Sequence, residues 1–429
     1  MASKTSARPR MNFAHDLCGF GGDMANQQHN DDHRMQRRMV HQELGSVTKS
    51  AQYDTFKQEG VHKLLARILD DPDSALKHVE LETGAVLLKM AYGYTVETGA
   101  TDPMVELMET VMNNFSAAIS PFTWAVDILP FLKYWPSIFP GGSFQRIAQN
   151  FKDSAEAARE VPFAFSKEQI KDGISVPSYV ARLLEQLDRK GESDESIKFD
   201  EDAIKWTAGI MYTAGSHTTV TSLHWFLLAM VMYPNVQKRA QEEITKVIGS
   251  DRLPQMEDRQ SLPYLEALVQ EIYRWNPVGP MSLPHAATSD VAYDGYIIPK
   301  GSIILPSVWW FCHDPEVYKN PTEFEPERYL DPRSEPDPKP VIFGFGRRTC
   351  VGRYFADSTI FLSVAQVLAS FDIEKSSLSP AEDERLQLAA QGCPGMINQP
   401  GSFGCKLTPR SKDITALIRQ ITKDLPEKI

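Results

Sequence analysis

The chain has 429 residues, of which 42% are hydrophobic and 24% are charged, so it can bury a large core. Its formal net charge of −11 argues against nonspecific binding of nucleic acid. Five cysteines without a Cys-x-x-Cys pair argue against a disulfide framework or a zinc module, and they favour a reducing compartment. No stretch approaches the ~18–20 apolar residues of a transmembrane helix.

The first two thirds of the chain are predicted to be mostly helical over 31–276, after an irregular, Gly- and Asn-rich stretch over 1–30. A basic amphipathic helix is expected from Asp32 to Leu44, and one long apolar helix from Asp200 to Met232. Other helices are predicted over 54–70, 75–94, 104–119, 143–160, 178–188, 234–248 and 263–274, with a Pro- and aromatic-rich stretch from Pro121 to Pro140.

The last third alternates between strands and helices. Short strands are predicted over 277–310, where the apolar run from Ile303 to Cys312 fits a buried strand. Residues 313–340 are expected to be irregular, and 341–375 mostly helical, with a long helix after Cys350. Loops and short strands are predicted over 376–409, and a final helix near 413–422. Without a linker or a repeat, residues 1–429 are interpreted as one mainly α domain with a small β region.

One cysteine stands in a setting that packing alone does not explain. The sequence around it reads Phe343-Gly344-Phe345-Gly346-Arg347-Arg348-Thr349-Cys350-Val351-Gly352 and then becomes helical. A thiol at a helix N-terminus beside arginines is biased toward thiolate, because N–H groups and the helix dipole favour the anion. An isolated cysteine is more often buried and inert. Here the surrounding pattern indicates a metal ligand or a nucleophile instead.

The pattern Phe-x-x-Gly-x-Arg-x-Cys-x-Gly resembles the haem-ligating loop of the cytochromes P450. The chain is similar to that family from about Arg8 to Arg410, and most similar to fungal members of specialised metabolism. The resemblance implies the cytochrome P450 fold and heme b, with Cys350 as the axial ligand to iron. It further implies that Phe343, Gly346 and Gly352 contact the haem.

The long helix carries the sequence Ala214-Gly215-Ser216-His217-Thr218-Thr219 at its middle. Small residues there let another body approach the backbone, which a close helix–helix crossing also explains. The segment resembles the oxygen-activation stretch of the P450s, with Thr218 at the position of the hydroxyl beside the oxygen site. His217 replaces the carboxylate of the family. We expect His217 either to relay protons near neutral pH or to turn away from the haem.

Glu271 and Arg274 form an i, i+3 pair that alone contributes only tenths of a kcal/mol. Together with Phe324-Glu325-Pro326-Glu327-Arg328-Tyr329 it resembles the Glu-x-x-Arg helix and the Pro-Glu-Arg-Phe segment of the family. The resemblance implies that Glu271, Arg274 and Arg328 form a buried network that holds the Cys loop.

The resemblance also implies cations for the two haem propionates. Arg348 and Arg37 match the arginines of the family, whereas His33 replaces a tryptophan, and His285 occupies the position of a third partner. Four further arginines are expected beside Cys350, either as a docking patch for an acidic electron donor or as scattered surface charges: Arg34, Arg38, Arg347 and Arg353.

By the same resemblance, a membrane anchor, a Pro-rich hinge, a first helix and the first strands of the larger sheet are expected ahead of the position of Met1. This sequence does not contain them. The family is expected at the endoplasmic reticulum membrane, and this chain, as given, is expected at its cytoplasmic face or in the cytosol. The segment from Ala389 to Phe403, where a substrate-contacting turn is expected, is unusual.

The leading interpretation is a monomeric haem-thiolate monooxygenase that uses O2 and electrons from NADPH. NADPH–cytochrome P450 reductase is the expected donor, with cytochrome b5 as a second one. The substrate is expected to be a lipophilic secondary metabolite, with a terpenoid favoured by family analogy, and the candidate pocket residues are Phe122, Trp124, Met211 and Ala214. A truncated, non-catalytic haem-binding remnant and a thiol hydrolase built on Cys350 and a histidine remain as alternatives.

Overall fold

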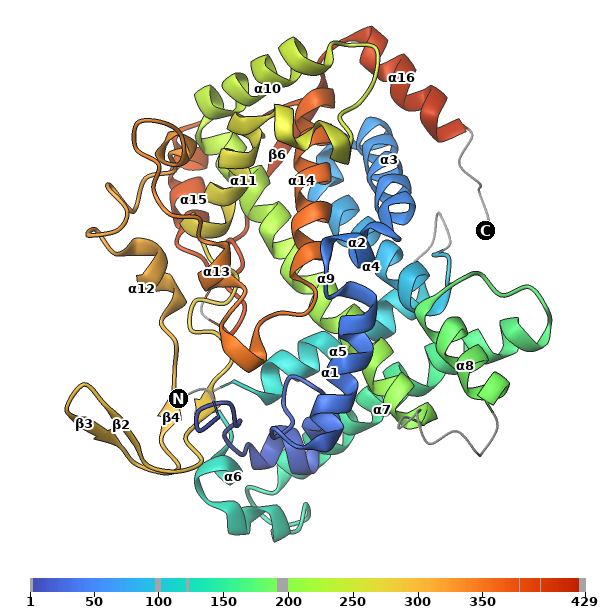
Figure 1. Ribbon diagram of the computed structural model, residues 1–429, viewed down its shortest axis with the longest axis vertical. Coiled ribbons are helices and arrows are strands. Elements are labelled where there is room, and N and C mark those ends of the chain that lie inside the picture. The colour runs from blue at the N-terminus through green and yellow to red at the C-terminus, as the bar shows by residue number, and fades with distance from the viewer. Residues whose placement is uncertain are drawn as a thin grey trace.

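The computed structural model describes residues 3–96, 102–120, 123–190, 200–377, 379–393 and 395–423. Within these residues the protein is mainly helical with small two-stranded sheets, so the expected fold class is confirmed (Figure 1). None of the helices in the described ranges has an apolar run that could span a bilayer.

Most helices begin and end close to the predicted positions. The helices of the first half are α1 Asp31–Leu44, α2 Val47–Ala51, α3 Asp54–Asp70, α4 Ala75–Tyr92, α5 Pro103–Ala118, α6 Ala125–Ile128, α7 Ser143–Lys171 and α8 Tyr179–Lys190. Those of the second half are α9 Glu201–Met232, α10 Pro234–Ile248, α11 Pro263–Trp275, α12 Val308–His313, α13 Lys339–Ile342, α14 Arg353–Ser370, α15 Pro380–Ala390 and α16 Lys412–Lys423.

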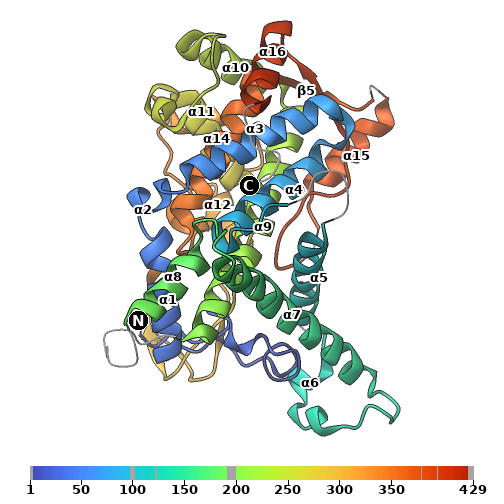
Figure 2. The same ribbon diagram turned by 90° about the vertical axis from the view of Figure 1, so that its right-hand side faces the viewer.

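The helix α9 runs through the interior of the molecule, as Figures 1 and 2 show. It begins at Asp200, whose side chain accepts a hydrogen bond from the Ala203 N–H. Its first half packs in one apolar core with α1, α4, α5, α7 and α8. Its second half packs in another core with α3, α10, α11 and α14. Since both cores meet on α9, this helix is apolar on nearly all sides.

Each of the small sheets is an antiparallel pair. β1 (His285–Ala286) pairs with β4 (Ile303–Ile304), and Ala7 adds an isolated bridge to Ala286. β2 (Val291–Tyr293) and β3 (Tyr296–Ile298) form a hairpin whose turn residues Asp294 and Gly295 have φ of 47° and 79°. β5 (Phe371–Lys375) pairs with β6 (Cys405–Pro409).

The expected buried strand over 303–312 is wrong. Only Ile303–Ile304 form a strand, and α12 follows Pro306. The tryptophans of this helix are exposed, with 43% of Trp309 and 50% of Trp310 accessible. The Trp309 ring stacks on His313 one turn later, at a centroid distance of 4.3 Å. This i, i+4 contact belongs to a helix, and an alternating strand pattern does not describe it.

Three other boundaries differ from the prediction. The segment 376–409 contains α15, whose Pro380 and acidic first turn are ordinary helix-start signals. α7 continues through the buried Pro162 to Lys171, because its Phe163 is also buried in the core around α9. The first thirty residues are not wholly irregular, since they hold a π-helical turn (η1, Asn12–Leu17) and a 3-10 turn (η2, Phe20–Gly22).

Candidate functional site

Cys350 lies at the end of a tight loop that leads into α14. Gly344 and Gly346 have φ of +75° and +59°, a conformation that glycine adopts at the lowest cost. The loop is closed by the Cys350 N–H, which donates to Phe343 O at 2.8 Å. A Cβ on Gly352 would meet only Cys350 Sγ at 4.0 Å, an ordinary contact. The glycines at 344 and 346 therefore shape the loop, whereas Gly352 has no steric requirement.

The Cys350 side chain opens on two cavities. One has a volume of about 700 Å³ and is also lined by Arg37, His285 and Arg348. The other has a volume of about 360 Å³ and is mostly apolar. Cys350, Phe343, Ala214 and Thr218 line both, so the two spaces meet at the cysteine loop and the middle of α9.

Although the Cys350 side chain is exposed to the cavities, its pKa in the protein chain alone does not show the expected bias toward thiolate. Burial raises the pKa of Cys350 above its ordinary value of 9.0. The N–H groups of Gly352 and Arg353 and the charges of Arg353 and Arg37 lower this pKa, but they do not outweigh burial. A coordinated metal ion deprotonates a thiol outright. Thiolate character at Cys350 therefore depends on metal coordination rather than on the loop.

Three buried or half-buried arginines surround the larger cavity without a carboxylate in ion-pair distance among the described residues. They are Arg8, Arg37 and Arg348, and each donates instead to backbone carbonyls. The acceptors are Thr349 O for Arg37; Ser6, Met24 and Gln27 O for Arg348; and Ala25, Leu283 and Pro284 O for Arg8. Sequence reasoning missed Arg8, which stands alone in an irregular segment.

The charges of these arginines fit a group that carries two carboxylates. Burial, and then repulsion from Arg348, lowers the pKa of Arg8 to about 10. Burial, and then repulsion from Arg37, lowers the pKa of Arg348 to about 10. Concentrated positive charge next to a cysteine ligand and an apolar wall matches the propionates, iron and ring of a haem.

The two histidines of the cavity are neutral near pH 7. Burial, and then Arg348, lowers the pKa of His33 to about 3, and its Nδ1 lies 3.2 Å from His29 Nδ1. Burial also lowers the pKa of His285, whose Nδ1 donates to Thr5 O at 2.7 Å. The free Nε2 of neutral His285 is therefore an acceptor. It can donate to a carboxylate only if His285 becomes protonated.

The small residues in the middle of α9 line the cavities and also allow a neighbouring helix to pack closely. A Cβ on Gly215 would come within 3.1 Å of Leu87 on α4, so Gly215 permits a close helix crossing. Thr218 lines both cavities, and its Oγ1 donates to Ala214 O at 2.7 Å. A hydroxyl that bonds back to the preceding turn competes with the helix ladder, as expected for this segment.

His217 faces a different space from Cys350. It lines a polar cavity of about 240 Å³ between α4, α5 and α9, together with Glu80, Glu109, Tyr212 and His224. Burial lowers the pKa of His217 below its ordinary 6.5. Among the expected pocket residues, Met211 lines the larger cavity and Ala214 lines both. Trp124 instead stacks on Phe13, with 3.6 Å between the ring centroids, and Phe122 lies outside the described residues.

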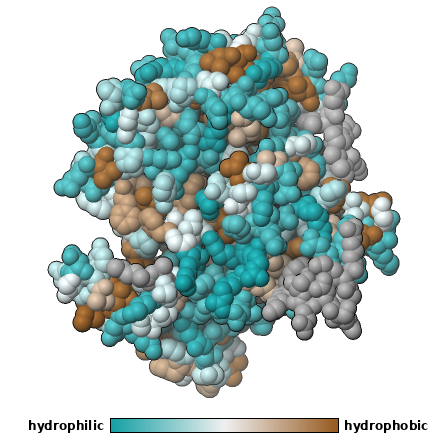
Figure 3. All heavy atoms as spheres, viewed as in Figure 1, coloured by the Kyte–Doolittle hydropathy of each residue, from teal (hydrophilic) through white to brown (hydrophobic). Residues whose placement is uncertain are grey.

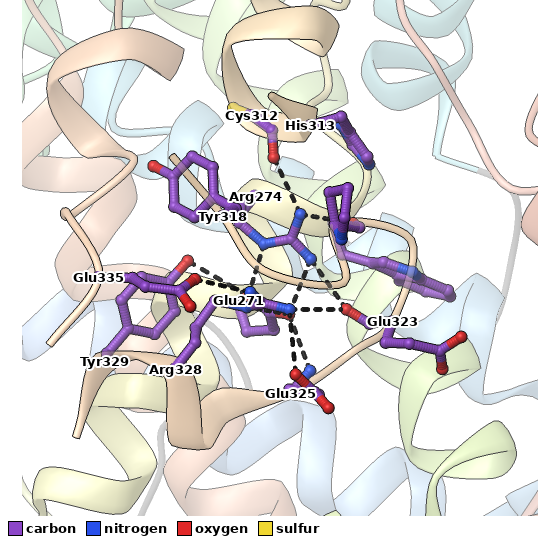
Figure 4. Close-up of polar contacts among 12 residues, drawn as sticks. Glu271, Arg274, Cys312, His313, Tyr318, Glu323, Glu325, Arg328, Tyr329 and Glu335 are labelled. Atoms are coloured by element: carbon purple, nitrogen blue, oxygen red, sulfur yellow. Dashed lines mark hydrogen bonds and ion pairs between the residues drawn. The ribbon is translucent and has the colours of Figure 1, made fainter. Parts of the chain in front are cut away.

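Glu271, Arg274 and Arg328 form a fully buried charge network, which Figure 4 shows. Arg274 Nε and Nη2 donate to the two Glu271 oxygens at 2.8 Å each, and Arg328 Nε donates to Glu271 Oε1 at 3.0 Å. The sequence did not reveal Glu335, which accepts from Arg328 Nη1 at 2.7 Å. Arg333 pairs with both Glu335 and Glu325, so the extended network has three carboxylates and three guanidinium groups. Backbone carbonyls accept the remaining guanidinium hydrogens.

A second network, which sequence reasoning missed, ties both ends of the cysteine loop to α11 and to the 3-10 turn before it (η5, Met256–Ser261). Lys339, before the loop, contacts Glu266 Oε1 at 2.6 Å, and Asp357, after it, contacts Arg259 Nη1 at 2.8 Å. Arg259 also donates to Glu266 at 2.7 Å, so the four side chains form one connected network. These residues lie in no motif, so only the fold brings them together.

Replacing Arg274 with alanine would leave the Glu271 charge buried without its bidentate partner. We expect Arg274→Ala to cost roughly 3–5 kcal/mol of unfolding free energy and to abolish haem incorporation. Urea denaturation and hemin titration measure the two effects. The control is Arg239→Ala, which removes a half-exposed pair with Glu327 and should cost under about 1 kcal/mol. A stable, haem-binding Arg274→Ala protein contradicts the assignment.

The contacts of Glu335 predict that the protein loses stability in acid. Burial raises the pKa of Glu335, but hydrogen bonds from Arg328 and Arg333 outweigh it, so the pKa lies below its ordinary 4.5. Its stabilisation is thus present above about pH 4.5 and lost as the pH falls through the folded-state pKa. Glu335→Gln should cost about 1–3 kcal/mol at pH 7 and flatten the acid limb of stability measured by urea denaturation. Parallel pH profiles for the two proteins would count against this role.

Residues 2–397 match the cytochrome P450 family. The multifunctional cytochrome P450 monooxygenase af510 of Aspergillus fumigatus is 44% identical over 99% of this chain and 80% of its own length. The cytochrome P450 monooxygenase CLM2 of Gibberella zeae is 40% identical, with coverage of 99% and 80%. A zebra fish cytochrome P450 structure with progesterone has a TM-score of 0.75 at 25% identity, covering 94% of this chain and 89% of that one. The chain therefore belongs to the cytochrome P450 family of monooxygenases.

Proposed function

We propose that this protein uses O2 and reductase-delivered electrons from NADPH to insert one oxygen atom into a C–H bond of a lipophilic secondary metabolite. One observation supports this proposal most strongly: Cys350, the Thr218 hydroxyl and two arginines line one cavity. The arginines, Arg37 and Arg348, have no carboxylate partner within the described part of the chain. Helices from both halves of the chain pack on α9, which supports a single domain over residues 1–429.

Heme b is the proposed cofactor, with Cys350 Sγ as the ligand to iron. Arg8, Arg37 and Arg348 would neutralise its propionates, and His285 would add a charge only when protonated. Phe343 and Gly346 shape the loop behind the ligand. When bound, the haem supplies the activation of O2 and the oxidising power.

The apolar cavity supplies the substrate site in this proposal. Its walls include Val111, Met112 and Phe115 from α5, and Met396 and Ile397 from the segment after α15. These side chains hold an apolar molecule and exclude water near Cys350. We assign a terpenoid substrate by family analogy. The relatives support the broader class, since one of them, 37% identical over 98% of this chain and 78% of its own length, is the O-methylsterigmatocystin oxidoreductase of Aspergillus flavus.

Electron delivery is proposed at the face that carries α1. Arg34, Arg38, Arg347 and Arg353 are charged groups on this side, and Figure 3 shows a strongly hydrophilic surface over α1. Arg347 and Arg34 both act on the pKa of His29, which indicates that they lie near each other. An acidic partner such as NADPH–cytochrome P450 reductase, or cytochrome b5, fits this surface. The endoplasmic reticulum is the proposed location.

One observation favours the second candidate, a haem-binding protein without catalysis, because His217 lines a cavity that excludes Cys350. The two candidates separate in a single experiment. Hemin-loaded protein, reduced under CO, tests thiolate ligation, and NADPH consumption with the reductase then tests turnover. We expect a thiolate-type CO spectrum and substrate-dependent NADPH consumption. Ligation without any consumption would favour the non-catalytic candidate.

The thiol hydrolase alternative gains no support. Burial raises the pKa of Cys350, whereas a catalytic cysteine needs a lowered one. The cavity histidines, His33 and His285, already bond to His29 and Thr5.

The propionate assignment predicts a difference between hemin and hemin dimethyl ester, which lacks the two negative charges. Arg348→Met should weaken hemin binding at least about tenfold but change ester binding by less than about threefold, because charge-assisted bonds are lost only with hemin. Hemin titration followed by absorbance gives both affinities, and Arg385→Met, an exposed arginine on α15, is the control. Equal losses for both ligands would refute the assignment.

His217 is the proposed proton-relay residue, fed from the polar cavity whose other titratable groups are Glu80 on α4, Glu109 on α5, and Tyr212 and His224 on α9. Because burial lowers its pKa, coupling of NADPH consumption to product should fall as the pH rises through a value below 6.5. His217→Ala should reduce coupling about tenfold or more, whereas His224→Ala, which lines the same cavity, should reduce it less. If His217→Ala leaves coupling unchanged, the relay is wrong.

A further inference from the structure

The apolar cavity beside Cys350 has a charged corner. Among the described residues that line it, Arg159 and Asp23 carry a charge at neutral pH. The surrounding wall is formed mostly by apolar side chains, such as Met108 and Phe115. A charged group in such a wall is costly unless it finds a partner. The partners of Arg159 therefore indicate what the cavity binds.

Arg159 lies on α7, which packs against α9 (Figure 2). Its stem crosses α9 at Gly209, where a Cβ would lie 4.0 Å from Arg159 Cγ. The guanidinium then stacks on the Trp206 ring, with Cζ 4.1 Å from the ring centroid. Glycine at 209 and tryptophan at 206 thus fix the guanidinium at the edge of the cavity.

Among the described residues, this guanidinium has one buried donor, Arg159 Nε, without a hydrogen-bond partner. The nearest carboxylate contact, from Nη1 to Asp202 Oδ1, is 3.8 Å, which is too long for a hydrogen bond. An unsatisfied buried donor in a folded protein calls for an explanation, such as an absent ligand. A guanidinium edge matches the two oxygens of a carboxylate.

We propose that Arg159 binds a carboxylate of the substrate, so that the substrate class is apolar molecules that carry a carboxylate. This inference rests on the proposed function and names its substrate more closely. A terpenoid acid belongs to this class, whereas a pure hydrocarbon does not.

The anchor also sets which end of the substrate reaches Cys350. Trp206, beneath Arg159, precedes Thr218 by twelve residues on α9, a rise of about 18 Å. Thr218 lines the cavity together with Cys350. A carboxylate held at Arg159 therefore lies far from the cysteine, and oxidation falls on a carbon remote from the carboxylate.

Asp23 is the competing anchor in the same cavity. Its Oδ1 accepts from the Ala25 N–H at 2.6 Å, and burial raises its pKa to about 6. Because Asp23 already accepts a backbone hydrogen bond, it has less unused hydrogen-bonding capacity than the Arg159 guanidinium. A cationic ligand at Asp23 is thus the alternative that the experiment must separate.

The test is equilibrium binding to the hemin-loaded full chain, measured by isothermal titration calorimetry with dodecanoate, methyl dodecanoate and dodecyltrimethylammonium. Dodecanoate should bind at least about tenfold more tightly than the other two. Arg159→Met should weaken dodecanoate about 10- to 100-fold, and the ester less than about threefold. The control is Lys205→Met, which removes a neighbouring cation that pairs with Glu160 at 2.7 Å and does not line the cavity.

The inference is overturned if the ester or the cationic probe binds as tightly as dodecanoate or more tightly. It is also overturned if Arg159→Met leaves the affinity for dodecanoate unchanged. If Arg159→Met does not fold, the comparison of the three probes on the unmodified protein decides alone. A thiolate-type CO spectrum recorded on the same sample separates this failure from failure of the proposed function.

Discussion

Two charge networks, one buried and one half-buried, hold the segment that presents Cys350, and the site depends on them. One joins α11 to the segment before the loop through Glu271, Arg274, Arg328 and Glu335. The other holds Lys339 and Asp357, at the two ends of the loop, against Glu266 and Arg259. Each buried charge costs several kcal/mol without its partners, so a network is favourable only when complete. The loop is thereby held in one arrangement.

Arginine has opposite roles in these networks and around the neighbouring cavity. Burial lowers the pKa of Arg274, but its hydrogen bonds and charge interaction with Glu271 raise it further, to above its ordinary value. Arg8 is buried and Arg348 half-buried, with carbonyl partners and no paired carboxylate in the described chain, and their pKa values fall to about 10. Their excess charge is a cost of folding that a dianionic group would relieve. The paired arginines stabilise the fold, and in our proposal the unpaired ones select what binds.

Residues in the middle of α9 line all three cavities. Thr218 and Ala214 line the spaces next to Cys350, whereas His217 lines the polar space between α4 and α5. Gly209, Trp206 and the stem of Arg159 lie toward its N-terminal end. In the proposed mechanism, one helix thus separates oxygen chemistry, proton supply and substrate recognition onto different turns and faces, which a single sequence motif describes only in part.

The sequence predicted the parts of the fold and site that depend on local pattern. The helix over 54–70 and the long helix from 201 to 232 follow from periodic or continuous apolar runs, and Cys350 and Glu271 stand in recognisable motifs. Lys339 and Asp357 could not be predicted, because their partners, Glu266 and Arg259, lie far along the chain and in no motif. Glu335 lies only seven residues after Arg328, but it is not part of the motif that contains Arg328. Arg159 gave no signal either, since its role depends on Gly209 and Trp206 of another helix. α12 was mistaken for a strand because short apolar runs do not distinguish the two structures.

The bond between Cys350 sulfur and haem iron is the central claim of this account. Low-temperature electron paramagnetic resonance of the hemin-reconstituted protein, compared with Cys350→His, tests it most directly. The account predicts a low-spin thiolate-type ferric spectrum in the unmodified protein and its loss in the variant. A protein that stays colourless with hemin, or a spectrum that Cys350→His leaves unchanged, would contradict it.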